Sequence, residues 1–592
     1  MIGPVFNREV TIAPRRTRFY MGRAAYAATL LMLMFTAWLV LTGTQVVRDV
    51  GDLARFGMIL FQILAPLQLA LASLLAATLA ASAVAQEKDR RTLELLLLTN
   101  LSNGELVLGK LAASLLSVLV MLAAALPVFM LAALLGGVSF GQIARVFAVT
   151  LASVVACGSL GSTVALWREK TFQSLATTVL ALVLWLAAGE ALAAGALGES
   201  WHGLPCATWA ACFSPWQAIL EAARPFAPSH STLGPVASSV YVFLAVATAV
   251  AALLNGVAIL RVRAWNCTPD AGQTRPDETA AADAPAGEVV PVGEQSTKAA
   301  AHTRQVWDNP VLWREIRTWA YGRKMLLIRL AYLVLVALVA ASLHWLVGNQ
   351  QLNAYAGGAV VLVPLCLLSL ILVNAQAVTA LTSERDNRAL DLLLVTDLSP
   401  KELVFGKLGG VFYNTKEMVV LPLLLCGYLC YGGTLGVENL LYLLVVLGVL
   451  YAFVATLGIH SGMIYANSRS AIGTSLGTVL FLFLGVATCM RMLVAFSGSF
   501  HVQLLPFSAL FLVGGVGLYV ALGARNPSSA IALASFLCPF ATFYAITSLW
   551  LGLRVGPFLV TVAAYGFATA AMLVPAIGEF DVATGRAAAD ET

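Results

Sequence analysis

EKDRRTLELLLLTNLSNGELVLGKL (residues 87–111) and ERDNRALDLLLVTDLSPKELVFGKL (residues 384–408) are two copies of one 25-residue stretch that lie 297 residues apart. Sixteen of the 25 positions are identical. Each copy follows one long apolar run and leads into another, so the stretch joins two predicted membrane spans. A charged, patterned segment that is kept twice between spans is typical of a docking surface. It predicts two equivalent contacts for a partner outside the bilayer.

The composition predicts an all-α, polytopic helical membrane protein. Of the 592 residues, 60% are hydrophobic and only 11% are charged, and the mean hydropathy is +0.86. A soluble protein carries roughly 25% charged residues, and runs of about 20 apolar residues recur along this chain. The fourteen candidate spans are 22–43, 56–85, 105–135, 140–166, 173–197, 236–260, 325–348, 355–381, 403–433, 437–465, 470–495, 503–524, 529–551 and 555–577. Segments 503–524 and 529–551 can include a re-entrant piece, so we rely on twelve of the fourteen.

The basic residues gather in short segments beside the spans, as the positive-inside rule describes. The net charge of +5 therefore does not indicate a nucleic-acid partner. We expect the lipid bilayer to be the main surroundings of the chain. We also expect the N-terminus and the central linker to be cytoplasmic.

The repeat extends beyond the central stretch. Gly3–Glu9 (GPVFNRE) is similar to Asn309–Glu315 (NPVLWRE), and Thr178–Leu180 matches Thr478–Leu480. This pattern predicts a tandem parallel repeat of a six-span unit, with the copies related by an axis along the membrane normal. The expected domains are a first repeat over 1–265, a linker over 266–304 and a second repeat over 305–592, with an extra apolar segment near 503–524. The linker is rich in Ala, Pro, Gly and acidic residues, which is typical of a flexible tether.

Each copy of the stretch predicts a helix, a sharp turn and a capped helix. Leu93, Leu96 and Leu97 share one helical face, and Glu87 stands four residues before Arg91, so the first helix is expected to continue from the preceding span. Ser102 and Ser399 each begin an S-x-x-E capping box. Two spans joined by such a rigid elbow could convert a push from a soluble partner into tilt. An ordinary tight hairpin is the alternative.

A second amphipathic element precedes the first span of each repeat, over Pro4–Tyr20 and Pro310–Lys324. Basic and aromatic residues alternate there, which suits a helix in the inner headgroup layer. A merely solvated basic flank is the alternative.

Two stretches resemble catalytic or nucleotide-binding motifs, but each lacks a residue or a structural setting that the motif needs. Gly104 to Lys110 matches the start of a P-loop, but Leu111 stands where a magnesium-binding Ser or Thr is needed. Gly473-Thr-Ser-Leu-Gly477 matches G-x-S-x-G, but it lies inside an apolar run. We therefore expect no catalytic residue, no metal site and no cofactor in this chain. Cys206 and Cys212 share a predicted outer loop and could pair or stay free.

Several polar residues lie within the predicted spans, where such residues are costly and often functional. The candidates are Glu190, Arg491, Asn374, Gln376, Lys416 and Glu417. Glu190 and Arg491 fall at similar depth in the fifth span of each copy, so we hypothesise that they face each other between the repeats. Lys416 and Glu417 could instead lie near the inner headgroups.

The repeated stretch resembles the signature of permeases of the type 2 ABC exporter family, and N-P-V-x-x-R-E resembles that family's amphipathic connecting helix. The resemblance covers most of both halves. It implies a transport subunit, not an enzyme, of the cell inner membrane. It also implies two cytoplasmic ABC ATPase partners per chain, which would hold ATP and Mg. The implied ATPase-coupling residues are Glu87, Arg91, Glu94, Thr99, Ser102, Glu105, Glu384, Arg388, Asp391, Thr396, Ser399 and Glu402.

Fusion of two units and the extra segment near 503–524 depart from the family pattern, in which single six-span units often pair. Two other functions stay open. One is a non-transporting membrane module that an ABC ATPase drives to transmit force or a signal. The other is an ion-coupled secondary transporter, which would need acidic residues near mid-membrane that this sequence supplies sparsely.

Overall fold

A computed structural model gives the structure of the chain. It describes residues 3–12, 17–44, 49–195, 198, 200–201, 204–224, 238–266, 307–317, 325–348, 354–396, 398–495, 504–524, 527–550 and 552–578. The predicted linker over 266–304 falls almost entirely outside these residues.

The first half is built from ten helices and one very short hairpin among the described residues. The helices are α1 (Pro4–Ile12), α2 (Thr17–Thr44), α3 (Val50–Asp89), α4 (Thr92–Leu98), α5 (Asn103–Leu134), α6 (Phe140–Trp167), α7 (Thr171–Ala193), α8 (Cys206–Phe213), α9 (Pro215–Ala223) and α10 (Ser239–Trp265). The antiparallel strands β1 (Ser200–Trp201) and β2 (Leu204–Pro205) lie between α7 and α8.

The second half has a similar order of elements. Its helices are α11 (Pro310–Arg317), α12 (Met325–Gly348), α13 (Ala354–Asp386), α14 (Ala389–Leu394), α15 (Pro400–Asn414), α16 (Lys416–Tyr431), α17 (Val437–Ile464), α18 (Ser468–Leu480), the π-helical turn η3 (Phe481–Gly485), α19 (Val486–Ala495), α20 (Leu504–Leu522), α21 (Ser529–Trp550) and α22 (Val555–Gly578).

Twelve helices in the described part of the chain are long and apolar enough to cross a membrane, which confirms the predicted polytopic all-α class. Two of the fourteen sequence-derived candidates are not among them. Segment 503–524 forms α20, whose apolar part, Phe507–Leu522, is shorter than a span. Segment 403–433 is not one helix, because the chain breaks at Thr415 between α15 and α16.

The break at Thr415 lies beside a buried hydrogen-bond site. Pro422 has no backbone N–H, so it cannot bond the carbonyl of Met418 one turn earlier. The hydroxyls of Tyr332 and Tyr451 donate to that carbonyl instead, at 3.3 and 3.5 Å. The first half has Ala125 at the position that matches Pro422, and α5 is continuous there although it contains Pro127 two residues later.

The longest helix, α3, is largely buried and organises the first half. Its 40 residues span about 60 Å at 1.5 Å per residue, about twice the hydrocarbon thickness. Small residues let neighbouring helices approach it: a Cβ on Gly161 of α6 would lie 2.3 Å from the carbonyl oxygen of Ala77. Gly458 of α17 approaches α13 at the matching position, where a Cβ would lie 2.5 Å from the Cβ of Ala377.

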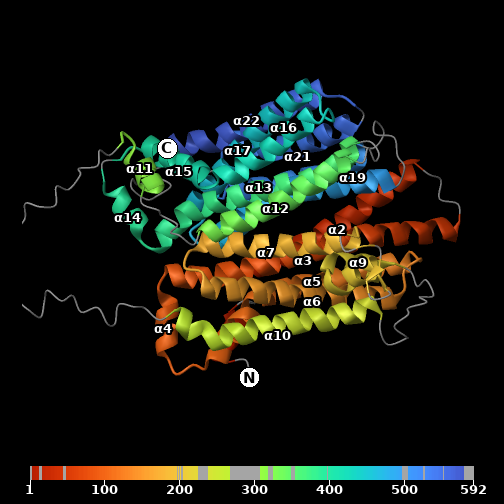
Figure 1. Ribbon diagram of the computed structural model, residues 1–592, viewed down its shortest axis with the longest axis horizontal. Helices are drawn as coiled ribbons and strands as arrows, with labels where there is room; N and C mark the ends of the chain where they lie inside the picture. The colour runs from red at the N-terminus through yellow and green to blue at the C-terminus, as the bar shows by residue number, and fades with distance from the viewer. Residues whose placement is uncertain are drawn as a thin grey trace, which may run out of the picture.

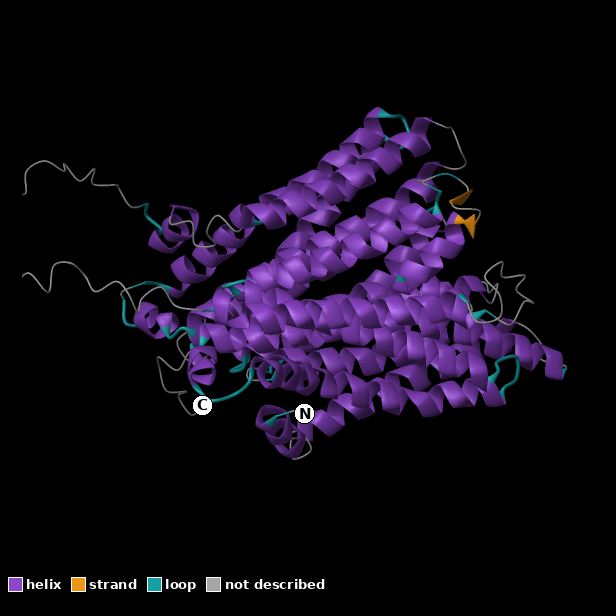
Figure 2. Ribbon diagram, turned by 60° about the horizontal axis from the view of Figure 1, so that its bottom comes forward, coloured by secondary structure: helices purple, strands orange, loops and turns teal. Residues whose placement is uncertain are grey.

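The two halves pack side by side with their helices roughly aligned (Figure 1). Helices α3 and α2 contact α18, α19 and α20 of the second half, and α7 contacts α12 and α13. In Figure 1 the short helices α4, α11 and α14 all lie at one end of the molecule. The second view shows the same near-parallel bundle of long helices, with the small strands at the other end (Figure 2). We call the end that carries α4 and α14 the elbow end.

Candidate coupling elbows

Both copies of the repeated stretch fold in the same way, and we call each the elbow of its half. In the first half, α3 ends at Asp89, Arg91 has a left-handed backbone with φ of 57°, and α4 follows. In the second half, α13 ends at Asp386 and Arg388 has φ of 58° before α14. Left-handed backbone is uncommon outside glycine. The same uncommon backbone at two matching arginines therefore shows that both elbows turn in the same way.

The prediction of one continuous helix from the preceding span through Leu97 is wrong. Each helix ends between the members of the expected i,i+4 pair, because the left-handed residue turns the chain. Glu87 forms an ion pair with Lys110 of α5 instead of Arg91. Arg90 pairs with Asp386 of the other half at 3.0 Å.

The predicted capping boxes are confirmed in both elbows. Ser102 Oγ accepts from the backbone N–H of Glu105 at 3.2 Å, and the Glu105 carboxylate accepts from the Ser102 N–H at 3.1 Å. Ser399 and Glu402 repeat this arrangement at 3.3 and 2.9 Å. Because its carboxylate accepts from the backbone N–H and then the hydroxyl of Ser399, the pKa of Glu402 is held below its usual range. The helices α5 and α15 therefore start at fixed positions.

The other implied coupling residues lie on the same elbows. Thr99 and Thr396 each donate their hydroxyl to the carbonyl three residues back, at 2.6 Å, which closes α4 and α14. Glu94 is in the first turn of α4 and is exposed. The side chain of Asp391 is not among the described side chains.

Each elbow also exposes apolar side chains at matching positions. Leu95 and Leu98 of α4 are 64% and 84% exposed, and Leu392 and Val395 at the matching positions of the second elbow are 75% and 87% exposed. From the sequence, Leu93, Leu96 and Leu97 were predicted to share one helical face, and no role was predicted for Leu95 or Leu98. The signal for a second, exposed face was available, since Leu95 and Leu98 do not share the spacing of Leu93, Leu96 and Leu97.

A buried lysine supports each elbow, and neither lysine was among the predicted site residues. Lys407 of α15 contacts Glu315 of α11 and Glu384 of α13, at 2.6 Å each. Arg314 also pairs with Glu384. In the first half, Lys110 is buried beside Glu87. The available signal was the G-K-L that ends both copies, which was set aside together with the rejected P-loop.

The amphipathic elements before the first spans form the short helices α1 and α11, which pack on the elbows. Helix α1 contacts α5, and α11 contacts α15. Asn309 donates to the carbonyl of Glu402 at 2.8 Å, and Val311 is buried where a Cβ on Gly406 would approach it to 2.9 Å. A merely solvated flank is therefore excluded for α11. Its place in a headgroup layer stays a prediction.

The polar candidates within the spans are not gathered into one site. Asn374 is buried, donates to the carbonyl of Val454 and accepts from Ser475, both at 2.9 Å. Gln376 is buried, and its Oε1 has no partner among the described residues. Glu417 pairs with Arg329 at 3.4 Å, and Lys416 lies 4.6 Å from the ring centre of Tyr413.

The hypothesis that Glu190 faces Arg491 is wrong. Glu190 is exposed at the end of α7 and accepts from Gln217 of its own half at 2.8 Å. Arg491 is exposed on α19, and no ion pair joins the two within the described part of the chain. The fifth span of the second half contains the π-helical turn η3. Such a turn changes the rotation of later residues about the helix axis, so residues at similar depth need not face the same way.

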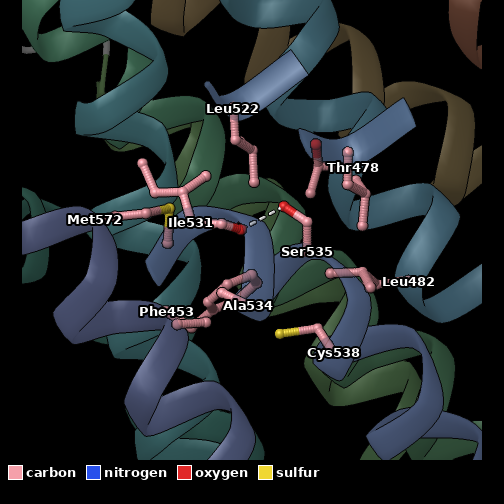
Figure 3. Close-up of a pocket in the computed structure, with 11 residues that line it drawn as sticks. Phe453, Thr478, Leu482, Leu522, Ile531, Ala534, Ser535, Cys538 and Met572 are labelled. Carbon is pink, nitrogen blue, oxygen red and sulfur yellow. Dashed lines mark hydrogen bonds between the residues drawn. The ribbon is translucent and has the colours of Figure 1, made fainter. Parts of the chain in front are cut away.

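A small apolar crevice in the second half offers no obvious chemistry (Figure 3). Phe453, Leu482 and Met572 are among its lining residues, and its interior space is about 10 Å³, roughly that of one water. The hydroxyl of Ser535 donates to the carbonyl of Ile531 at 2.8 Å, so this donor already has a hydrogen-bond partner within the protein. Across the described residues no three His, Cys, Asp or Glu side chains are grouped to hold a metal. Cys206 and Cys212 are free thiols.

Comparison with known proteins agrees with the resemblance noted in the sequence. Residues 20–253 match the family model described as ABC-2 family transporter protein. No curated protein and no solved structure matches the chain. The matched region begins in α2, contains the whole first elbow and extends into α10. Over this region, which is less than half of the chain, the sequence is similar to the ABC-2 transporter family.

Proposed function

We propose that this chain is the transmembrane subunit of an ATP-driven ABC exporter. Two cytoplasmic ATPase subunits, which bind ATP and Mg, would dock on the two elbows. Their movement would rock the two halves and release substrate to the outside. In this proposal the elbow end faces the cytoplasm, the chain lies in the cell inner membrane, and the halves are two copies of one six-span unit.

The observation that carries the proposal is the matched pair of elbows at one end of the molecule (Figure 1). Helix α3, which leads into the first elbow, is about 60 Å long and so extends well beyond a hydrocarbon layer of about 30 Å. Each exposes apolar side chains, Leu95 and Leu98 in one elbow and Leu392 and Val395 in the other. Apolar side chains that project together from an otherwise charged segment are typical of an interaction surface.

The elbows are also built to transmit force. The capping boxes fix where α5 and α15 begin. Lys407, Glu315 and Glu384 form an ion-pair cluster that connects α15, α11 and α13. A push on α14 would therefore move these three helices together. Lys110 and Glu87 provide the corresponding tie in the first half. A rigid connection between docking surface and spans is what coupling to an external motor requires.

The proposal is tested by affinity purification of the tagged chain from its native membrane in a mild detergent. We expect an ABC ATPase to co-purify at two copies per chain. The variant L98E/V395E should lose it, because a charge replaces an apolar contact in each elbow. The matched control is L134E/V437E, which makes the same type of change at exposed apolar residues at the opposite end of the spans. It should keep the ATPase.

The other outcomes separate the alternatives. Recovery of the chain alone in all three forms would contradict the docking proposal and favour a secondary transporter. An ATPase that binds through the elbows, but whose hydrolysis moves no substrate in reconstituted vesicles, would favour a module that transmits force or a signal.

A further inference from the structure

One ion pair crosses between the halves where the two elbows begin. Arg90 donates from Nε and Nη2 to Oδ1 of Asp386, at 3.2 and 3.0 Å. The Asp386 side chain is buried, and its other oxygen accepts the hydroxyl of Ser468 from its own half. Charge-assisted hydrogen bonds to a buried carboxylate are stronger than those between neutral groups. The pair therefore fastens the first elbow to the second half.

The matching position carries no such pair. Asn387 stands where Arg90 stands in the other copy, and its amide donates to the carbonyl of Ser383 in its own helix at 2.9 Å. Asp89, which matches Asp386, accepts from the neutral hydroxyls of Thr171 and Ser383. The Asp89 side is not uncharged, since Lys170 of the same half lies near this carboxylate. The two sides differ because Asp386 receives an arginine from the opposite half.

Arg90 is placed where motion of the elbow would reach it directly. It precedes Arg91, the left-handed residue at which the chain turns from α3 into α4. A shift of α4 would pass through that single residue to Arg90. A shift of α14 would reach the same ion pair from the other side, through Arg388 and Asn387 to Asp386, where α13 ends.

We propose that Arg90 and Asp386 form an asymmetric latch that holds the elbow ends of the two halves together and opens when an elbow moves. Arg90 and Asp386 are positioning residues in this proposal. The latch is asymmetric because the first elbow supplies the arginine and the second half supplies the carboxylate. This inference rests on the proposed function only for what moves the elbow, since the latch itself lies within the chain.

The test is hydrogen–deuterium exchange of the purified full chain in detergent, read in peptides that cover the helix ends near residues 89 and 386. Replacing Arg90 by Asn (R90N) gives both halves the same residue. We expect roughly three- to fivefold faster exchange at both helix ends, the size expected for an ion pair with one half-exposed partner. Asp386→Asn should act in the same way. Asn387→Arg should slow exchange, because it adds a matching pair with Asp89.

Two further variants separate a latch from a local structural effect. Asn387→Ala removes only a bond within α13, so it should leave exchange near residue 89 unchanged. The charge exchange R90D/D386R should restore most of the protection that R90D loses. Unchanged exchange in R90N, or no rescue by the charge exchange, would overturn the proposal. No ATPase is present in these measurements, so failure of the docking proposal would not affect the result.

Discussion

At the scale of single residues, the buried lysines decide how firmly each elbow is held. Lys407 is almost fully buried between Glu315 and Glu384, whereas the Glu87 partner of Lys110 is partly exposed. Removing one partner of a buried ion pair costs about 3–5 kcal/mol, because the remaining charge stays buried without a partner of opposite charge. Lys407→Met should therefore lower the free energy of unfolding by about 3 kcal/mol and Lys110→Met by less. Thermal unfolding of the purified chain, followed by circular dichroism, measures both.

The exposed Lys401 of the same helix is the matched control. Lys401→Met should shift the melting temperature little, because surface charges contribute about 0–1 kcal/mol. Equal shifts for Lys401→Met and Lys407→Met would show that the cluster does not stabilise the elbow.

Single residues also show what the sequence could not reveal. The capping boxes were predictable because Ser102 and Glu105 interact within three residues of chain. The partners of Lys407 and Arg90 were not, because Glu315 lies 92 residues from Lys407 and Asp386 lies 296 residues from Arg90. The local pattern predicted Arg91 as the partner of Glu87 on an intact helix, and the turn at Arg91 excludes that pair.

At the scale of elements, the turn that begins each elbow depends on residues 91 and 388. A left-handed backbone costs an ordinary residue about 1–2 kcal/mol, whereas asparagine tolerates it and β-branched residues do not. We expect Arg91→Asn or Arg388→Asn to keep or raise the melting temperature. Arg91→Val or Arg388→Val should lower it. Thermal unfolding of the four variants tests this order.

The exposed Arg261 in the regular helix α10 is the control site. Asn and Val have similar helix propensities, so Arg261→Asn and Arg261→Val should melt close together. If Asn and Val behaved alike at residue 91 as well, the left-handed turn would not be what selects the residue.

Most membrane-spanning helices could be predicted from the sequence, but one helix break could not. Twelve spans could be predicted because about 20 apolar residues are a strong signal. The break at Thr415 could not, since residues 403–433 read as one run. Nor could the sequence show that Tyr332 and Tyr451 reach the nearby Met418 carbonyl from other helices.

At the scale of the whole molecule, the asymmetric latch predicts how separated halves should assemble. If the halves are copies of one unit, two molecules of residues 1–266 would bring each Arg90 to an Asp89, and so form two ion pairs. Two molecules of residues 305–592 would bring Asn387 to Asp386 and form none. Co-expressed as separate chains, the two halves should still bind each other, because α3, α7, α13 and α18 make the contacts between them.

We therefore expect a graded series when tagged and untagged halves are co-expressed and purified through the tag. Recovery of the untagged half should be greatest for the mixed pair and intermediate for two first halves. It should be lowest for two second halves. Arg90→Asn in the first half should reduce its self-association, and Asn387→Arg in the second half should raise it, since each changes the number of cross-half ion pairs. Equal self-association of both halves, unchanged by these substitutions, would show that the latch contributes nothing to how the halves assemble.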